Sequence, residues 1–353
     1  MLRYEEFKQE IQDDIKLYLP EKFADATVTV QTVMKNNDTA LDGLMIRGEG
    51  DTVVPNIYLN DLYERYENGA DLSDIKQDIA DIRVKHDQLD LPIDISDLGD
   101  LDKVRDRIDC KLVNLENNQE YLSGKPHEEF EDLAVVYSVN LSNSIELMSA
   151  VVSDGMMEQW GITQNELHDI AMENLSNQDL ELINMRDMMM EMMGVDKDDP
   201  VAALMFPPDE VGMYVLTNHE RVNGAKAILD QGTMDGIAEK LGGDFIVLPS
   251  SIHECIVLPN AAEMDARTLS NMVQDVNRTQ VDPKEVLSDH VYCYDAKAHE
   301  LIRAEKYVDR QNDRSNERHE NKSMKDKLAE KKAEVAKAAP AKTHLGKTAA
   351  HDL

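Results

Sequence analysis

The stretch 245–258 constrains the fold of this chain more than any other part of it. Two short aliphatic runs, 245–248 and 255–258, flank a compact polar insert. Short apolar runs bounded by polar residues are typical of buried strands. The sequence therefore predicts two strands joined by a polar connection, at a place where functional sites are often built. The insert contains Ser250, Ser251, His253 and Glu254.

These four side chains are the candidate catalytic residues of the chain. A serine beside a histidine suggests a nucleophile and its base. Alternate residues of a strand share a face and neighbours do not, however, and no glycine-flanked nucleophile elbow is present. His253-Glu254 also lacks the second histidine of a metalloprotease helix, because position 257 is valine. The competing interpretation is a structural turn whose hydroxyls cap backbone groups.

A second polar segment follows the predicted strand 211–216. His219 and Arg221 lie in it and are candidate binding residues. If strands 211–216 and 244–248 are neighbours in one sheet, this loop and the polar insert lie side by side. The sequence then predicts a pocket that combines His219 and Arg221 with Ser251, His253 and Glu254.

Helical and strand patterns mix along the chain without regular alternation, which predicts an α+β fold. Residues 1–92 read as a small domain of order α-β-β-β-α-α, residues 99–304 as a larger α+β domain, and residues 305–353 as a disordered tail. The strands expected in the small domain are 26–34, 41–47 and 52–59. The last strand expected in the larger domain is 290–294.

Several helices carry specific expectations. Phe7, Ile11 and Ile15 recur at four-residue spacing and predict an amphipathic first helix. A helix over 72–86 is expected to bury Ile75, Ile79 and Ile82. Thr163 and Glu166 form a capping box that predicts a helix start. The methionine-rich run 182–193 is expected to be a helix whose stripe of Met185, Met188, Met189 and Met192 packs into a core or lines an interface with another helix.

The charge balance excludes nucleic acid as a partner of the folded body. The chain has a net charge of −33, and the tail holds 12 of the 37 basic and 9 of the 70 acidic residues. Residues 1–304 therefore carry a net charge of −36. Phosphate binding requires clustered Lys and Arg, so such a field repels nucleic acid and anionic membranes.

No cofactor or metal site is predicted. The three cysteines, Cys110, Cys255 and Cys293, are far apart and lack zinc-type spacing. A methionine run without nearby Cys or His favours packing over Cu(I) binding. There is no apolar stretch long enough to span a membrane and no signal-peptide pattern at the start, so the protein is expected to be cytoplasmic.

Several short strings resemble a family of uncharacterised bacterial proteins, a domain of unknown function common in anaerobic gut bacteria. The resemblance covers about residues 1–304 and implies no activity, so it transfers no functional residues. The strings that carry it are 4–7, 41–44, 55–59, 133–137, 160–163, 214–218, 248–254 and 287–292.

From the missing catalytic spacings, the sequence favours a non-enzymatic binding or regulatory module. The alternative is a hydrolase-like enzyme acting through Ser251, His253 and Glu254. A protein partner is compatible with the sequence, which does not identify one.

Overall fold

The computed structural model describes residues 1–51, 53–87, 93–142, 148–196, 205–206, 212–249, 251–259, 265–316, 324–325 and 331. Backbone contacts divide the chain into two units, Met1–Arg303 and Ala304–Leu353. The fold is mixed α+β, as the sequence predicts. The division of the first unit at residues 93–98 stays a prediction.

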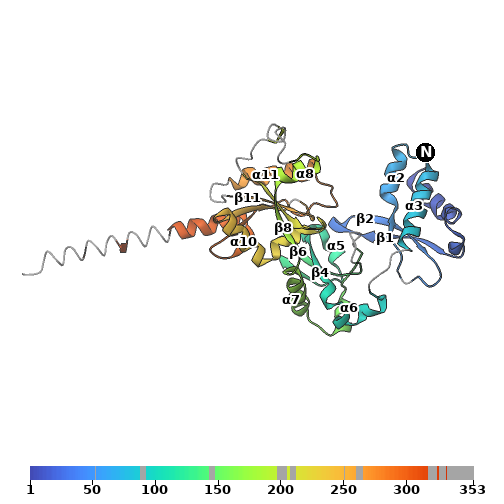
Figure 1. Cartoon of the computed structure of the whole chain (residues 1–353), viewed down its shortest axis with the longest axis horizontal. Helices are drawn as coiled ribbons and strands as arrows, with labels where there is room; N and C mark the ends of the chain where they lie inside the picture. The colour runs from blue at the N-terminus through green and yellow to red at the C-terminus, as the bar shows by residue number, and fades with distance from the viewer. Residues whose placement is uncertain are drawn as a thin grey trace, which may run out of the picture. The chain divides into compact units, whose positions relative to one another are not determined.

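The N-terminal part has the predicted order of elements. A three-stranded antiparallel sheet of order β1-β2-β3 packs with three helices (Figure 1). The elements are α1 (Tyr4–Asp14), β1 (Thr27–Met34), β2 (Ala40–Arg47), β3 (Ile57–Tyr58), α2 (Leu59–Glu67) and α3 (Leu72–His86), with short 3-10 turns at Ile15–Tyr18, Glu21–Phe23 and Asn36–Asp38. Phe7, Ile11 and Ile15 are fully buried in the core between them, which confirms the predicted face of the first helix.

Two expectations for this part are wrong. The strand expected over 52–59 is reduced to Ile57–Tyr58. Pro55, two residues before this strand, has no backbone N–H to donate to a neighbouring strand. In α3, Ile82 is 44% exposed, whereas Arg83 is 1% exposed. The buried stripe of the helix therefore runs through Ile75, Ile79 and Arg83.

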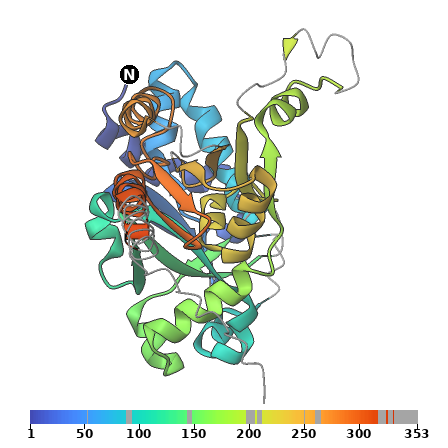
Figure 2. The ribbon, with the colours of Figure 1, turned by 90° about the vertical axis from the view of Figure 1, so that its left-hand side faces the viewer.

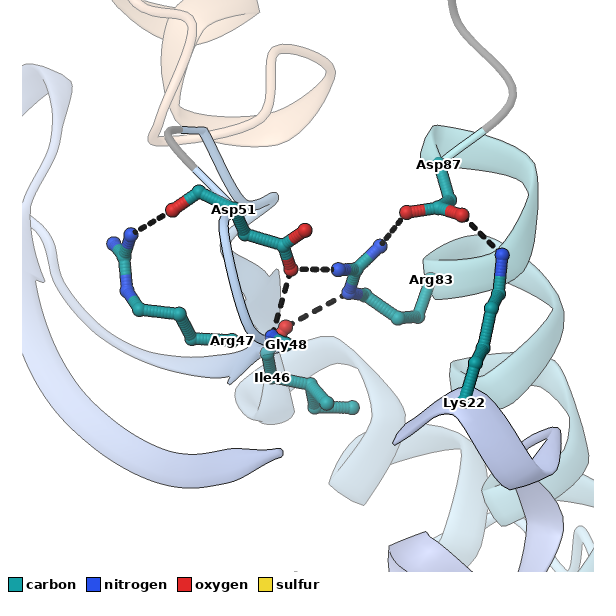
Figure 3. A network of polar contacts seen from close by, with 7 residues as sticks. All are labelled: Lys22, Ile46, Arg47, Gly48, Asp51, Arg83 and Asp87. Carbon is teal, nitrogen blue, oxygen red and sulfur yellow. Dashed lines mark hydrogen bonds and ion pairs between the residues drawn. The ribbon is translucent and has the colours of Figure 1, made fainter. Parts of the chain in front are cut away.

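Arg83 is buried because it is surrounded by polar partners (Figure 3). Its Nε donates to the carbonyl of Ile46 at 2.7 Å, and its guanidinium pairs with Asp51 and with Asp87. Asp87 also pairs with Lys22. A buried guanidinium is stable only when its donors are satisfied in this way. The network fixes the turn after β2 against α3.

The middle of the chain forms a four-stranded antiparallel sheet. Strand β6 is central: it pairs with β4 on one side and with β5 and β7 on the other. Helix α7 packs against β4 (Figure 1). The elements are 3-10 turns Ile95–Gly99 and Arg105–Arg107, α4 (Leu101–Val104), β4 (Ile108–Asn114), 3-10 turn Glu116–Asn118, α5 (Gln119–Leu122), β5 (His127–Phe130), β6 (Leu133–Asn140), β7 (Ser149–Val151), α6 (Asp154–Trp160) and α7 (Gln164–Leu175).

Helix α7 begins as predicted. Thr163 and Glu166 form a reciprocal capping box, in which the Thr163 hydroxyl accepts from the Glu166 N–H and the Glu166 carboxylate accepts from the Thr163 N–H. Leu167, Ile170 and Leu175 on this helix are buried.

The last part of the first unit is a six-stranded antiparallel sheet of order β13-β12-β10-β11-β9-β8. The strand expected over 290–294 is β12 (Tyr292–Asp295). It is not the last strand, because β13 (Glu300–Arg303) follows it. The elements are β8 (Leu180–Asn184), α8 (Met185–Met192), β9 (Tyr214–Asn218), 3-10 helix η7 (Gly224–Leu229), α10 (Gln231–Leu241), β10 (Phe245–Leu248), β11 (Cys255–Pro259), α11 (Ala266–Thr279), β12 and β13.

The two larger sheets share one hydrophobic core. Val135 and Tyr137 of β6 belong to the same buried cluster as Phe245 and Val247 of β10. Ile246 and Leu248 of β10 are also buried but lie outside this cluster. Alternate residues of a strand face opposite sides of a sheet, so β10 is covered on both sides.

The methionine prediction is wrong in its detail. Residues 180–184 are strand, and in α8 only Met190 is buried, in a small cluster with Phe206. Met189 and Met192 of the expected stripe are 48% and 73% exposed. Strand β8 is an edge strand, and α8 follows it at the margin of the first unit (Figure 2).

In the second unit, residues 304–316 are helical. The disorder expected from residue 305 therefore does not apply to residues 305–316. Most of the remaining tail, 317–353, lies outside the described residues. No helix among the described residues is long and apolar enough to cross a membrane.

Candidate functional site

The polar insert is the connection between β10 and β11, which pair as an antiparallel hairpin. Ser251 forms an isolated bridge with Val286, and the N–H of Ile252 donates to the carbonyl of Glu285 at 2.9 Å. Backbone pairing therefore holds the insert against the segment that follows α11. Ser250 lies outside the described residues.

The side chains of the insert are engaged locally. The Ser251 hydroxyl accepts the backbone N–H of His253 at 3.1 Å. Nδ1 of His253 accepts the backbone N–H of Asn223 at 3.2 Å, and its Nε2 lies 3.5 Å from Oε1 of Glu285. A general base needs a free ring nitrogen facing the serine hydroxyl. Here the structure directs both ring nitrogens elsewhere.

The loop after β9 lies beside the insert, although the two strands are not direct neighbours. Strand β11 lies between β9 and β10 and runs antiparallel to both, so the ends of β9 and β10 point to the same edge. The contacts are made by Thr217, whose hydroxyl donates to the His253 carbonyl at 2.8 Å, and by Asn223.

His219 and Arg221 turn toward other partners. Nδ1 of His219 lies 3.0 Å from Oε1 of Glu181, and Arg221 pairs with Glu191 at 3.2 Å. The bond to Glu181 and its negative charge raise the pKa of His219. The structure thus brings the two predicted segments together, but it places these two side chains on the side of β8 and α8.

Gly224 makes the close approach between loop and insert possible. A Cβ at this position would lie 2.6 Å from the His253 carbonyl oxygen and 2.7 Å from the Asn218 nitrogen. Both neighbours are backbone atoms, which cannot move aside easily. Only glycine fits here, and the chain then enters η7.

Helix η7 carries the buried cation of the site, Lys226, which is 2% exposed. Its Nζ donates to both carboxylate oxygens of Asp109 on β4, at 2.6 Å and 2.7 Å. Asp109 also accepts from Gln178 at 3.0 Å and from the N–H of Cys110 at 2.8 Å. Burial raises the pKa of Asp109, but the charge and hydrogen bond of Lys226 outweigh it and hold the pKa below its ordinary value.

A cavity of about 460 Å³ opens beside this ion pair. Its floor is one face of the four-stranded sheet, and its other walls are the α7–β8 connection and the loop after β9. The lining is strongly polar. It includes five amide side chains, Asn140, Asn177, Gln178, Asn218 and Asn223, with Asp109, Lys111, Ser138, Ser149, Asp179, His219, Glu220 and Lys226, together with Cys110, Val136, Tyr137, Val151 and Val222.

Of the proposed site residues that the structure describes, only His219 lines this cavity. Asp109 and Lys226 were missed. A signal for both exists in the sequence: Asp109 lies between Ile108 and Cys110 in a strand, and Lys226 lies between Ala225 and Ala227 in an apolar run. Charged residues at buried positions are rare unless they are paired.

The described residues contain no group of His, Cys, Asp and Glu side chains that could hold a metal ion. All three cysteines are buried, and none is part of a disulfide. Burial raises the pKa of Cys110 to about 12 and also raises that of Cys255. Thiols in this state are poor nucleophiles.

Residues 4–296 match the family of unknown function DUF5688, and the chain belongs to this family. No curated protein and no solved structure matches the chain.

Proposed function

We propose that this member of the family is a non-enzymatic binding module of the cytoplasm, which takes a small polar ligand into the cavity beside Asp109 and Lys226. The observation that carries the proposal is the lining of this cavity. Five residues with amide side chains and a buried ion pair line a cavity of about 460 Å³. Ligand sites are concave and orient their ligands through a few fixed polar groups.

The ion pair supports binding because it holds the cavity walls in place. Lys226 ties η7, which follows β9, to β4 of the other sheet. Gln178 joins the same carboxylate from the α7–β8 connection. Amide groups carried on such a rigid frame are already oriented. Less of the binding free energy is therefore lost to ordering these side chains when a ligand binds.

The insert supports a binding module rather than the hydrolase alternative. The Ser251 hydroxyl accepts from a backbone N–H, and the His253 ring faces Asn223 and Glu285. Neither Ser251 nor His253 lines the cavity. Their bonds serve to close the β10–β11 connection onto its neighbours.

Two further features support the cytoplasmic assignment and the exclusion of nucleic acid. Cysteines outside disulfides are typical of compartments that keep thiols reduced, and none of the three cysteines of this chain is part of a disulfide. The net charge of −33 opposes nucleic acid binding.

The test is a screen of small polar metabolites by native mass spectrometry and thermal shift. Ser138→Trp, on the cavity floor, should abolish capture of the ligand because the indole fills the cavity. Ser123→Trp, at an exposed turn outside the lining, is the matched control and should bind normally. Equal binding by both variants, or none by the unmodified protein, would rule the proposal out.

A further inference from the structure

Lys111 is the second cation of the cavity, and it differs from Lys226 in its surroundings. It lies two residues after Asp109 on β4, so both side chains are on the same face of the strand, roughly 7 Å apart along it. Both line the cavity. The Asp109 carboxylate, however, is held by Lys226 at 2.6 Å, and no other described carboxylate pairs with Lys111.

Lys111 lies over an aromatic ring, and the charges near it are those of other cations. Its Nζ lies 5.0 Å from the centroid of the Tyr121 ring, and Nζ of Lys125 lies 4.1 Å from the same centroid. Two ammonium groups therefore share one ring. Lys35 adds a third positive charge that acts on both Lys111 and Tyr121. This cluster of Lys35, Lys111 and Lys125 stands out in a body whose net charge is −36.

The positive charges of these lysines repel one another, and partial burial strengthens the repulsion. Burial and the charge of Lys35 lower the pKa of Lys111 to about 8. Burial and the charge of Lys111 lower the pKa of Lys125, which Asp38 partly offsets. An anion placed against Lys111 would relieve this repulsion.

Other charges also face the cavity. Asp109 and Lys226 neutralise each other along the floor. Asp179, Glu220 and His219 lie in the wall formed by the α7–β8 connection and the loop after β9. The cation without a carboxylate partner is therefore Lys111, while the opposite wall carries an excess of negative charge.

We propose that Lys111 anchors the oxyanion of a small ligand, a carboxylate or a phosphate group, at its end of the cavity. The amides beside Asp109 then bind the polar remainder of the ligand. This inference rests on the proposed function, because it names the ligand class of the same cavity.

Binding of an anion at Lys111 is coupled to protonation of the Lys111 amine. An anion at Nζ favours the charged amine and raises its pKa. Binding of the anion is therefore strongest below about pH 8, where Lys111 is already charged. Above that pH each unit should weaken binding about tenfold, because one proton must be taken up first.

The experiment uses the full chain with acetate and inorganic phosphate as probes. Titrations are followed through the NMR signal of the Lys111 side chain, assigned by its loss in Lys111→Arg. Acetate keeps a constant charge over the range, so its pH profile reports Lys111. Phosphate shows whether a dianion is preferred. We expect saturable shifts with both probes and a raised Lys111 pKa in the bound state.

Three variants make the test specific. Lys111→Met should weaken binding of both probes at least tenfold, and Lys111→Arg should largely retain it. The matched control is Lys240→Met, since Lys240 also lies over a tyrosine ring, 5.1 Å from the centroid of Tyr214, and does not line this cavity. It should bind normally. Unchanged Lys111 signals with both probes, or equal loss in Lys240→Met, would overturn the inference.

The two proposals fail in different ways. A metabolite that is blocked by Ser138→Trp but binds equally well to Lys111→Met would overturn the role of Lys111 and leave the binding module intact. Oxyanion binding that requires Lys111, in a protein that captures no metabolite from the screen, would support the role of Lys111 and count against the binding module.

Discussion

Lys226 and Asp109, which are 117 residues apart in the sequence, form an ion pair in which Nζ contacts both carboxylate oxygens. Lys226 is 2% exposed. The pair connects η7 of the six-stranded sheet region to β4 of the four-stranded sheet, directly beside the polar cavity. The same two side chains therefore join the two sheets and line the proposed binding cavity.

Lys226→Met should lower the free energy of unfolding by about 3–5 kcal/mol, because it leaves the buried Asp109 carboxylate without its cation. The double variant Asp109→Asn/Lys226→Met should recover much of this loss, since no unpaired charge remains. Urea unfolding of the four proteins of this double-mutant cycle measures the coupling. Strictly additive losses would contradict the pairing.

The Asp109 pair also predicts how stability changes with pH. The folded pKa of Asp109 is lowered, so its contribution is present above the unfolded pKa of about 4 and is lost as the pH falls through the folded value. The stability difference between the unmodified protein and Asp109→Asn should be constant from about pH 7 to about pH 5, and should shrink as the pH is lowered from about 4 through the folded value. A difference that is constant over this range would show that Asp109 does not titrate as described.

Gly224→Ala should destabilise the fold by about 1–3 kcal/mol, because its Cβ would collide with backbone atoms of His253 and Asn218. Gly236→Ala is the matched control. Gly236 lies inside α10 with nothing within 4 Å of its Cβ position, so alanine there should stabilise the protein by about 0.5–1 kcal/mol. Thermal unfolding of both variants measures the contrast, and a shift of the same sign in both would refute it.

Lys111 predicts a pH dependence of the same sign as that of Asp109, but in the alkaline range and because burial disfavours its charged form. Its folded pKa of about 8 lies below that of an unfolded lysine, so the unfolded chain binds more protons between that pH and roughly pH 10.4. The unmodified protein should therefore gain stability relative to Lys111→Met as the pH rises through this window. Chemical unfolding across the window measures the slope. A flat difference would mean that the amine is solvated like an ordinary surface lysine.

Ser251→Ala should cost about 1 kcal/mol of stability, because the hydroxyl accepts the N–H of His253 within a buried turn. Ligand binding should be unchanged, since Ser251 lies outside the cavity lining. Calorimetric unfolding and the metabolite screen measure the two effects. Loss of binding or of any hydrolytic activity with unchanged stability would instead favour an enzyme.

Local patterns predicted many elements correctly, because their causes are local. The apolar face of α1 follows from the spacing of Phe7, Ile11 and Ile15, and the start of α7 follows from the reciprocal bonds of Thr163 and Glu166. Sequence patterns failed where tertiary packing determined which side chains are buried. Arg83 replaced Ile82 in the buried stripe of α3, since Asp51, Asp87 and a backbone carbonyl satisfy its guanidinium.

The sequence by itself determined the α+β class, the two strands on either side of the polar insert and the acidic character that opposes nucleic acid. These follow from periodicity, turn residues and summed charge, which depend on near neighbours or on composition. Only the tertiary structure decided which polar groups meet. The cavity exists because β4 and η7 come together, and the ion pair of Asp109 with Lys226 leaves Lys111 without a carboxylate partner in the part of the chain that the structure describes. Such partnerships depend on distances across the fold, which one-dimensional spacing does not contain.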